Sequence, residues 1–441
     1  MASDLAAGGR LAGLIFMGLA SLHFATAWTG GPARNWHGQT SEYYPLLADA
    51  FLAGQTSLLI HPPPEMLALP DPYDPEANAN YRLHDASLYH GKYYLYFGPT
   101  PAIVLFLPYR VLTGSHLPTR IAVALFCNLG FAFSCLLLFV LARHQEWDLP
   151  GWLASFAVLS MGSVPGVAFL LIRPSFYEIA IGAGYCFVMA GFLFFARGVL
   201  SERPRAGPLA TAGLCFGLAA GCRPDLCVLA VLMAALVVIR FRFYKGPVLA
   251  FLVPAAACGI LLAIYNFVRF DNPLEFGIRY TLLANRADLG EHFGRGFGNL
   301  VPGIWNLAAS SPKLLPLAPS MGLVWGAPIA ILGLGAPFLM RHHFVKDFVA
   351  RPLARFTIDA IYIAALVILV LLAFLGFVLG RYTVDFAPEF LLLAWCVAVA
   401  LWQPIRTAPR LWRFVFAFGL AAATLYSAVL DFSFCVTRVP T

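Results

Sequence analysis

Carboxylates that could act on a substrate gather in two long polar segments, residues 29–120 and 269–319. In the first segment, Glu42 and Asp49 lie in a stretch whose apolar side chains recur at helical spacing. Because seven residues make nearly two helical turns, both carboxylates share one face, about 10 Å apart along the axis. Such a face is either a solvated polar surface or a place where a carboxylate accepts a proton.

Two further groups of acids invite a metal interpretation. Asp71, Asp74 and Glu76 lie in a proline-rich stretch, and Asp85 lies between His84 and His90. Asp-Pro pairs are primarily turn formers, and neither spacing matches a known calcium or zinc pattern. We therefore expect turns and no metal site.

Cations that could hold a phosphate stand at the edges of apolar segments. Lys92 lies among five aromatic residues in 89–97, a composition typical of the lipid headgroup level. Arginine binds phosphate through a planar fork of donors, and it can equally form a simple ion pair at a helix end. Charged residues occur at the outer ends of the expected helices and are almost absent from their centres: Arg173, Glu178, Arg223, Asp225, Arg269, Asp271, Arg381, Asp385 and Glu389.

The elements that must position these groups are membrane helices. The chain has 441 residues, of which 60% are hydrophobic and only 12% charged, whereas soluble domains have roughly 45–50% and about 25%. A span needs about 20 mainly apolar residues. The sequence therefore predicts an all-α polytopic membrane protein with about eleven transmembrane helices, near 11–28, 121–142, 151–172, 176–196, 207–221, 225–239, 248–268, 320–340, 357–379, 387–402 and 412–430.

The arginines and lysines predict the orientation of these helices. With a cytoplasmic N-terminus, the short inner connections are rich in arginine and the short outer ones are poor in it, as the positive-inside rule requires. The inner connections are 143–150, 197–206, 240–247, 341–356 and 403–411. The net charge of +7 is thus a topology signal, and it does not call for a nucleic-acid partner.

This orientation divides the chain into five parts: a first helix (1–28), an outer loop (29–120), a helix bundle (121–268), a second outer loop (269–319) and the C-terminal helices (320–441). Within the first loop we expect surface helices near 42–54 and 101–113. Residues 11–28 also have features of a signal peptide, with Ala25-Thr26-Ala27 as a small-residue cleavage site, but we favour an uncleaved first span.

In layout, the chain resembles the GT-C class of membrane glycosyltransferases, such as the protein mannosyltransferases and the aminoarabinose transferase of lipid A. Three local matches carry the resemblance: Glu42-Tyr43-Tyr44 with Ala48 and Gly54, Gly98-Pro99-Thr100-Pro101, and Arg381-Tyr382 with Pro388. One departure matters. The family usually opens its loop with Asp-Glu and uses that Asp in catalysis, whereas here Thr40-Ser41 precede Glu42.

The resemblance implies an inverting transfer of a sugar from a polyprenyl-phosphate carrier to a lipid or glycan acceptor. Glu42 is the first candidate for the general base, with Asp49 and Asp85 as the alternatives. The departing phosphate needs cations and donors, for which the candidates are Lys92, Arg279, Arg381, Tyr382 and Arg173. No metal or other cofactor is required.

Two alternatives remain open, a lipid or glycan transporter or flippase and a non-catalytic membrane scaffold. Transporters normally need ionisable groups near the midplane of the membrane, and the expected span centres have almost none. The missing Asp favours the scaffold. For the transferase, we expect a bacterial inner-membrane protein with its site facing the periplasm.

Overall fold

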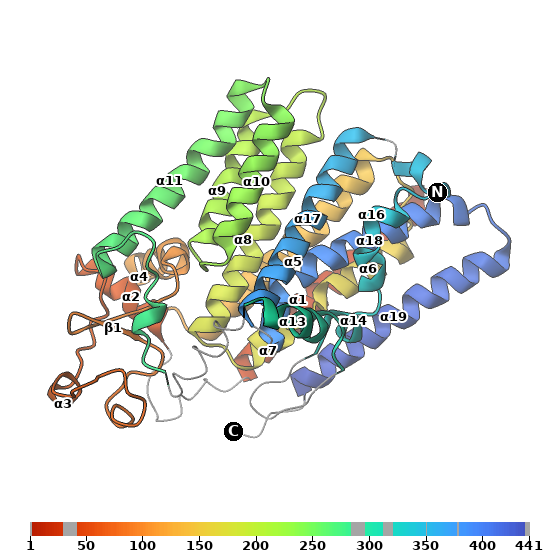
Figure 1. Cartoon of the computed structure of the whole chain (residues 1–441). Coiled ribbons are helices and arrows are strands. Elements are labelled where there is room, and N and C mark those ends of the chain that lie inside the picture. The colour runs from red at the N-terminus through yellow and green to blue at the C-terminus, as the bar shows by residue number, and fades with distance from the viewer. Residues whose placement is uncertain are drawn as a thin grey trace.

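The computed structural model describes residues 2–29, 42–283, 296–311, 321–349, 351–376 and 379–436, and these segments are mainly helical (Figure 1). Thr40-Ser41 and much of the second outer loop lie outside the described residues. The described helices form one elongated bundle, with the irregular segments of both outer loops gathered at one end (Figure 1).

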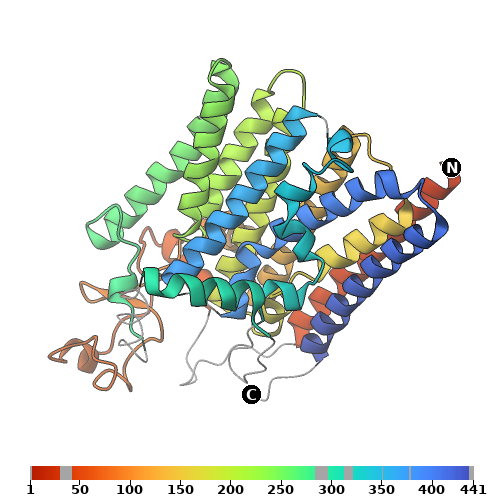
Figure 2. The ribbon, with the colours of Figure 1, turned by 45° about the vertical axis from the view of Figure 1, so that its right-hand side comes forward.

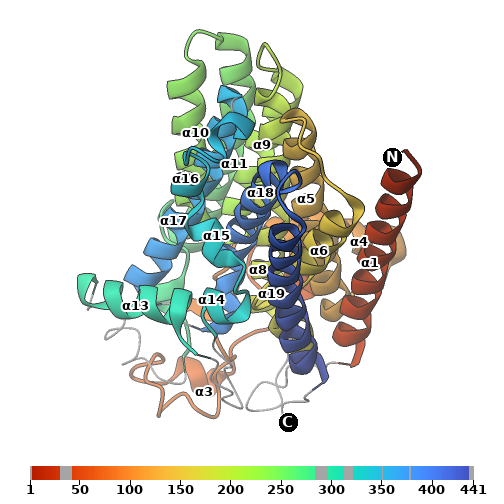
Figure 3. The same cartoon turned by 90° about the vertical axis from the view of Figure 1, so that its right-hand side faces the viewer.

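Seven of the described helices are long and apolar enough to cross a membrane. They are α1 (Ala2–Thr29), α5 (Thr119–His144), α8 (Phe176–Val199), α11 (Lys245–Phe270), α17 (Pro352–Leu375), α18 (Ala387–Ile405) and α19 (Arg410–Val436). Helix α8 is central and packs against α5, whereas α1 and α19 stand at the edge of the bundle (Figure 3). These seven helices agree with seven of the expected spans.

The other four expected spans are shorter or broken. The windows 207–221 and 225–239 form α9 (Ala206–Ala220) and α10 (Leu226–Phe241), which are apolar but fall below the length of a full span. The structure therefore does not contain eleven full-length spans within the described residues. Helix α9 packs against both its predecessor α8 and the later helix α11.

The window 151–172 was wrong as a single helix, since it divides into α6 (Gly151–Gly162) and α7 (Val167–Ile172). Pro165 and Gly166 separate the two helices, and Gly166 has a φ of +96°. A Cβ atom there would lie 2.7 Å from the Thr383 hydroxyl, so this break is also a close packing site.

The window 320–340 was wrong for a similar reason. It forms three short helices, α14 (Leu323–Gly326), α15 (Ala330–Leu334) and α16 (Ala336–Leu339). Pro328 and Pro337 each remove a backbone donor, and Gly335 separates the last two helices. The short 3-10 helix η3 (Lys346–Val349) follows, before α17 begins.

The first outer loop contains both helices expected there. The stretch 42–54 forms α2 (Tyr43–Leu52), which buries Tyr43, Tyr44 and Leu47. The stretch 101–113 forms one turn of π-helix, η1 (Ala102–Phe106), continued by α4 (Leu107–Thr113). Between them lie α3 (Pro64–Leu67) and a hairpin of β1 (Ser87–Tyr89) and β2 (Lys92–Tyr94), paired antiparallel with Leu88 opposite Tyr93.

The second outer loop contributes η2 (Ile278–Tyr280) and α13 (Phe297–Ala309). Helix α13 lies across the ends of the long helices (Figure 2). A last 3-10 helix, η4 (Gly380–Asp385), connects α17 to α18 at the same end of the bundle.

The two outer loops are joined by backbone hydrogen bonds. The Asp85 N–H donates to the Leu282 carbonyl at 3.2 Å, and the Leu282 N–H donates to the Ala86 carbonyl at 2.9 Å. The Ser87 hydroxyl adds a bond to the Gly277 carbonyl at 2.8 Å. These bonds fix the residues before β1 against a segment almost 200 positions later in the sequence.

Candidate active site

Asp85 stands where the two outer loops meet. Its backbone has a φ of +54°, which Asp tolerates better than most residues, and the residue is only 8% exposed. Its Oδ1 atom is buried without a hydrogen-bond partner, and His84 Nε2 lies 3.7 Å from it, beyond hydrogen-bond distance. Asp85 is therefore a buried carboxyl group in a strained backbone conformation with an unused acceptor.

The pKa of Asp85 is raised above its ordinary value. Burial is the main cause, because a carboxylate loses its hydration there. The positive charges of His84, Arg381 and Arg82 oppose this shift without cancelling it. A raised carboxyl pKa, nearer to neutrality, is the property that a general base needs.

Arg381, one of the predicted phosphate-binding cations, lies close enough to this carboxyl group for its charge to lower the pKa of Asp85. It lies on η4, donates to Glu178 Oε1 at 3.2 Å, and stacks over the ring of Tyr177 with 4.5 Å to the centroid. Glu178 is 2% exposed, and its second carboxylate oxygen accepts from the Ser175 hydroxyl. Burial alone would lower the pKa of Arg381, but Tyr382 and Glu178 raise it, so the guanidinium stays charged.

A second arginine, Arg223, is buried next to Arg381 in the loop between α9 and α10. Arg223 forms an ion pair with Asp225 at 3.2 Å and another with Asp385, and it stacks over the ring of Tyr382 at 5.2 Å. Burial raises the pKa of Asp385 to about 7, and Arg223 opposes that shift. The predicted Tyr382 therefore lies between two arginines.

Tyrosine hydroxyls complete the surroundings of Asp85. The Tyr43 hydroxyl donates to the His84 carbonyl at 2.5 Å, which holds α2 against the segment before β1. The pKa of Tyr96 is raised, first by burial and then by the charge of Asp85, while Arg381 lowers it. Asp85, Arg381, Arg223, Tyr96 and Tyr382 thus form one electrostatically coupled group, which we call the rim cluster.

Sequence reasoning placed Arg223, Asp385 and Glu178 among the charged residues at outer helix ends but did not include them among the site candidates. Tyr96 was considered only as one of the five aromatic residues in 89–97. The signal that could have found the arginine is the pair Arg223 and Asp225, two residues apart at the start of an apolar helix. A charged side chain that is buried away from water needs a partner of opposite charge. An Arg and an Asp placed so close together beside an apolar helix therefore indicate a buried ion pair.

Glu42 lies at the N-terminus of α2, as expected, but its surroundings differ from those of Asp85. Its Oε2 atom accepts from the Thr119 hydroxyl at 2.5 Å, which connects α2 to the first turn of α5. Thr119 is 2% exposed, so this bond is partly shielded from solvent. Glu42 remains a candidate base with a hydroxyl group already bound to it.

Asp49 is bound in an ion-pair network. Its two carboxylate oxygens contact Arg110 Nε at 2.9 Å and His116 Nε2 at 2.7 Å. These contacts fix α2 against α4 and the turn after it. Because Arg110 and His116 occupy both oxygens, Asp49 is well placed to hold α2 against α4.

The remaining predicted cations are spread over the outer surface. Lys92 is exposed on β2, and the Arg279 side chain is 84% exposed and 3.6 Å from Glu275. Arg173 is half-buried at the end of α7. Of the five predicted phosphate-binding residues, the structure thus brings Arg381 and Tyr382 together with Asp85.

The acids of the proline-rich stretch form turns. Asp71 accepts from the Tyr73 N–H at 2.8 Å, and Asp74 accepts from the Glu76 N–H at 2.9 Å. His90 lies 3.9 Å from Asp271. In the described part of the chain, no group of three His, Cys, Asp or Glu side chains is placed to hold a metal ion.

The Gly98-Pro99-Thr100-Pro101 segment packs against the loop that carries Arg223. The Thr100 N–H donates to the Gly221 carbonyl at 3.0 Å, and the Gly98 N–H donates to the Cys222 carbonyl at 3.3 Å. A Cβ atom on Gly98 would lie 2.1 Å from the Gly221 oxygen. Only glycine allows this approach, which brings Tyr96 and Arg223 to the same end of the bundle.

No protein-family model and no curated protein matches the sequence. The structure is similar to the oligosaccharyltransferase AglB from Archaeoglobus fulgidus in complex with an inhibitory peptide and a dolichol-phosphate. The TM-score is 0.53 with 13% identity, over 98% of this chain and 56% of that one. The oligosaccharyltransferase of the same organism in complex with Zn and sulfate gives a TM-score of 0.57 with 13% identity, over 96% and 53%.

ArnT from Cupriavidus metallidurans bound to undecaprenyl phosphate gives a TM-score of 0.48 with 15% identity, over 97% of this chain and 76% of that one. The chain spans about half the length of the archaeal enzyme, and at such low identity the likeness is one of fold. The seven apolar helices and this likeness agree with the architecture expected from the sequence. The chain is thus an integral membrane protein with the GT-C fold.

Proposed function

We propose that the chain is a membrane glycosyltransferase, which moves a sugar from a polyprenyl-phosphate carrier to a lipid or glycan acceptor at the outer face of the membrane. The observation that supports this proposal best is the rim cluster. In it, a buried carboxyl group with an unused oxygen lies in the field of the half-buried Arg381, which shares the ring of Tyr382 with the buried Arg223. In this GT-C fold, Asp85 of the cluster lies where the two outer loops are joined through Leu282.

In the proposed reaction, Asp85 accepts the proton of the acceptor hydroxyl. The hydroxyl oxygen forms a bond to the anomeric carbon from the face opposite the phosphate, which gives inversion. The bond between the anomeric carbon and the phosphate oxygen breaks, and its electron pair leaves with the carrier phosphate. Arg381 and Arg223, aided by the hydroxyl groups of Tyr96 and Tyr382, stabilise the negative charge that develops there.

Asp85 replaces Glu42 as the first candidate for the base because of its environment. The Asp85 carboxyl is buried, has a raised pKa and lies in the field of Arg381, where a phosphate would bind. Glu42 binds the Thr119 hydroxyl through one carboxylate oxygen, and both oxygens of Asp49 contact Arg110 and His116, whereas Asp85 Oδ1 is buried without a hydrogen-bond partner. Glu42 then fits best as a residue that binds the acceptor beside α5.

The proposal also covers cofactors, substrates and location. The reaction needs no metal or redox cofactor, because a carboxylate and arginines suffice for the proton transfer and for the leaving group. The substrates are a polyprenyl-phosphate sugar and an acceptor within a bilayer, and no nucleic acid takes part. We place the protein in a bacterial inner membrane, with the rim cluster facing the periplasm.

The test uses purified protein in liposomes with a panel of synthetic undecaprenyl-phosphate sugars carrying a tritiated glycosyl group. We expect one sugar to move into a lipid or glycan extract, and undecaprenyl phosphate itself to compete with the donor. Labelled lipid that crosses the bilayer unchanged would support the transporter alternative. The absence of both transfer and undecaprenyl-phosphate binding would contradict the proposal.

A further inference from the structure

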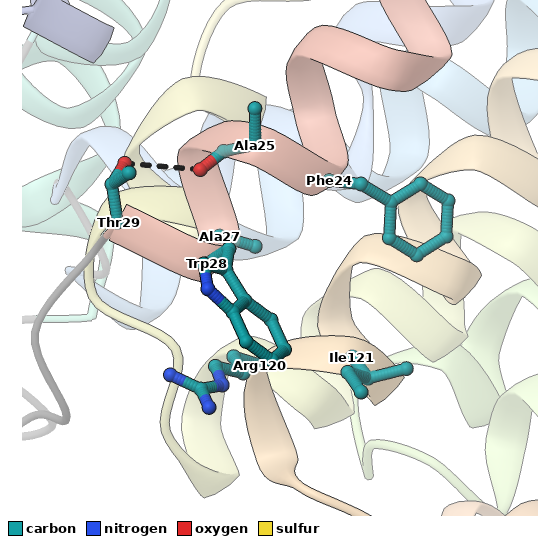
Figure 4. A pocket seen from close by; sticks show the side chains of 7 residues that line it. All are labelled: Phe24, Ala25, Ala27, Trp28, Thr29, Arg120 and Ile121. Carbon is teal, nitrogen blue, oxygen red and sulfur yellow. Dashed lines mark hydrogen bonds between the residues drawn. The ribbon is translucent and has the colours of Figure 1, made fainter.

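An open groove lies between the outer ends of α1 and α5, away from the rim cluster. It has a volume of about 460 Å³, within the range of about 300–1,000 Å³ typical of ligand pockets. The groove is lined by Phe24, Ala25, Ala27, Trp28 and Thr29 of α1 and by Arg120 and Ile121 of α5. Its walls are therefore almost wholly apolar, with one cation at one end (Figure 4).

The cation is Arg120, whose guanidinium carbon lies 4.0 Å from the centre of the Trp28 ring (Figure 4). Among the residues that the structure describes, Arg120 has no carboxylate partner. The sequence that follows α1, residues 30–41, contains no Asp or Glu that could supply one. Within the described part of the chain, Arg120 thus brings a positive charge without an ion-pair partner to the end of an apolar groove.

The groove opens towards the surroundings of the bundle. Helix α1 is a candidate membrane span, and only 22% of its apolar window is buried inside the protein. Phe24 is 41% exposed and Trp28 is 60% exposed. In the membrane this face contacts hydrocarbon, and Trp and Arg are the residues that mark the level of the lipid headgroups.

From this complementarity we propose that the groove binds one anionic glycerophospholipid of the surrounding membrane. Its phosphodiester contacts Arg120, and an acyl chain lies along Phe24 and Ile121. A phosphodiester carries one negative charge, which a single arginine matches, whereas a phosphate monoester carries about 1.5 to 2 near neutral pH. The site is distinct from the rim cluster, so the inference stands without the proposed function.

The lipid would also have a structural consequence. Arg120 follows Thr119, whose hydroxyl donates to Glu42 at the start of α2. A lipid bound to Arg120 would therefore immobilise the first turn of α5, against which α2 begins. Its binding is expected to stabilise the folded protein by mass action.

The test compares Arg120→Gln with Arg242→Gln, each purified in detergent and titrated with phosphatidylglycerol or phosphatidylcholine, with bound lipid counted by native mass spectrometry. Arg242 is a matched control, because it is exposed, stacks over Phe243 at 4.8 Å and lies outside the groove. We expect wild type and Arg242→Gln to bind phosphatidylglycerol at least tenfold more tightly than phosphatidylcholine. Arg120→Gln should lose this preference.

A second pair of variants tests the groove without changing a charge. Ala25→Phe fills the groove and should weaken phosphatidylglycerol binding, whereas Leu14→Phe, on an exposed part of the same helix, should not. A chain that binds both lipids equally well has only nonspecific contact with bulk lipid, which overturns the inference. Selective binding that survives both Arg120→Gln and Ala25→Phe overturns it as well.

Discussion

The substitution Asp85→Asn separates a catalytic role of this carboxyl group from a structural one. Asparagine has the same shape and tolerates a positive φ, so the backbone at +54° and its bond to Leu282 can persist. Alanine would be a poorer test, because it adds a backbone cost of about 1–2 kcal/mol in the left-handed region. The substitution removes the carboxylate charge and the ability to accept a proton, while the size of the side chain and the backbone conformation are kept.

The expected loss of activity follows from general-base catalysis. A positioned base contributes about 10²–10⁴-fold to the rate, so sugar transfer by Asp85→Asn should fall by that factor, or by about 3–5 kcal/mol of transition-state free energy. Stability should behave differently. Because the pKa of Asp85 is raised on folding, the folded protein loses stability as the pH rises through that raised pKa. The variant has no such loss, so it should be at least as stable at neutral pH.

The assay measures tritiated sugar transfer in liposomes and thermal unfolding of the same preparations, with Glu42→Gln in parallel. In wild type, activity should rise with pH as Asp85 loses its proton, with a midpoint above the usual carboxyl range. If Asp85→Asn transfers sugar at the wild-type rate, the assignment of the base is refuted. If only Glu42→Gln is inactive, the original expectation for Glu42 is correct.

Three further substitutions test the surroundings of this site. Arg381→Lys keeps the charge and the ion pair with Glu178 but loses the planar fork of donors, so kcat/KM for the polyprenyl-phosphate donor should fall about 10-fold to 100-fold. An unchanged kcat/KM contradicts phosphate binding at this position. Asp49→Asn should lower the free energy of unfolding by about 1 kcal/mol and leave the rate of sugar transfer almost unchanged. A variant that is stable but inactive would make Asp49 a catalytic candidate again. Gly98→Ala places a methyl group against the Gly221 oxygen and should lower the free energy of unfolding, followed by thermal unfolding, by about 1–3 kcal/mol. A variant as stable as wild type would mean that the segment around Gly98 moves away from Gly221 at little cost.

Local patterns in the sequence determined most of the elements. Seven apolar windows became seven long helices, because a segment of about 20 apolar residues satisfies its backbone internally and buries its side chains wherever it lies. The helical spacing of Tyr43, Leu47 and Ala50 likewise predicted α2, and all three side chains are buried there. The two broken windows contain proline and glycine, so a stricter reading of those residues would have found the breaks.

The choice among the carboxylates was decided by tertiary structure. Asp85 became the best candidate because a backbone bond to Leu282 holds it in a buried position, and because Arg381 approaches from a segment almost 300 residues later. Asp49, which shares a helix face with Glu42, was instead occupied by Arg110 and His116. Burial and charge fields depend on contacts between distant segments, and no local spacing records them. The sequence therefore indicated which end of the membrane bundle carries the charged groups, while only the packing of the loops decided which carboxyl group lies buried beside an arginine.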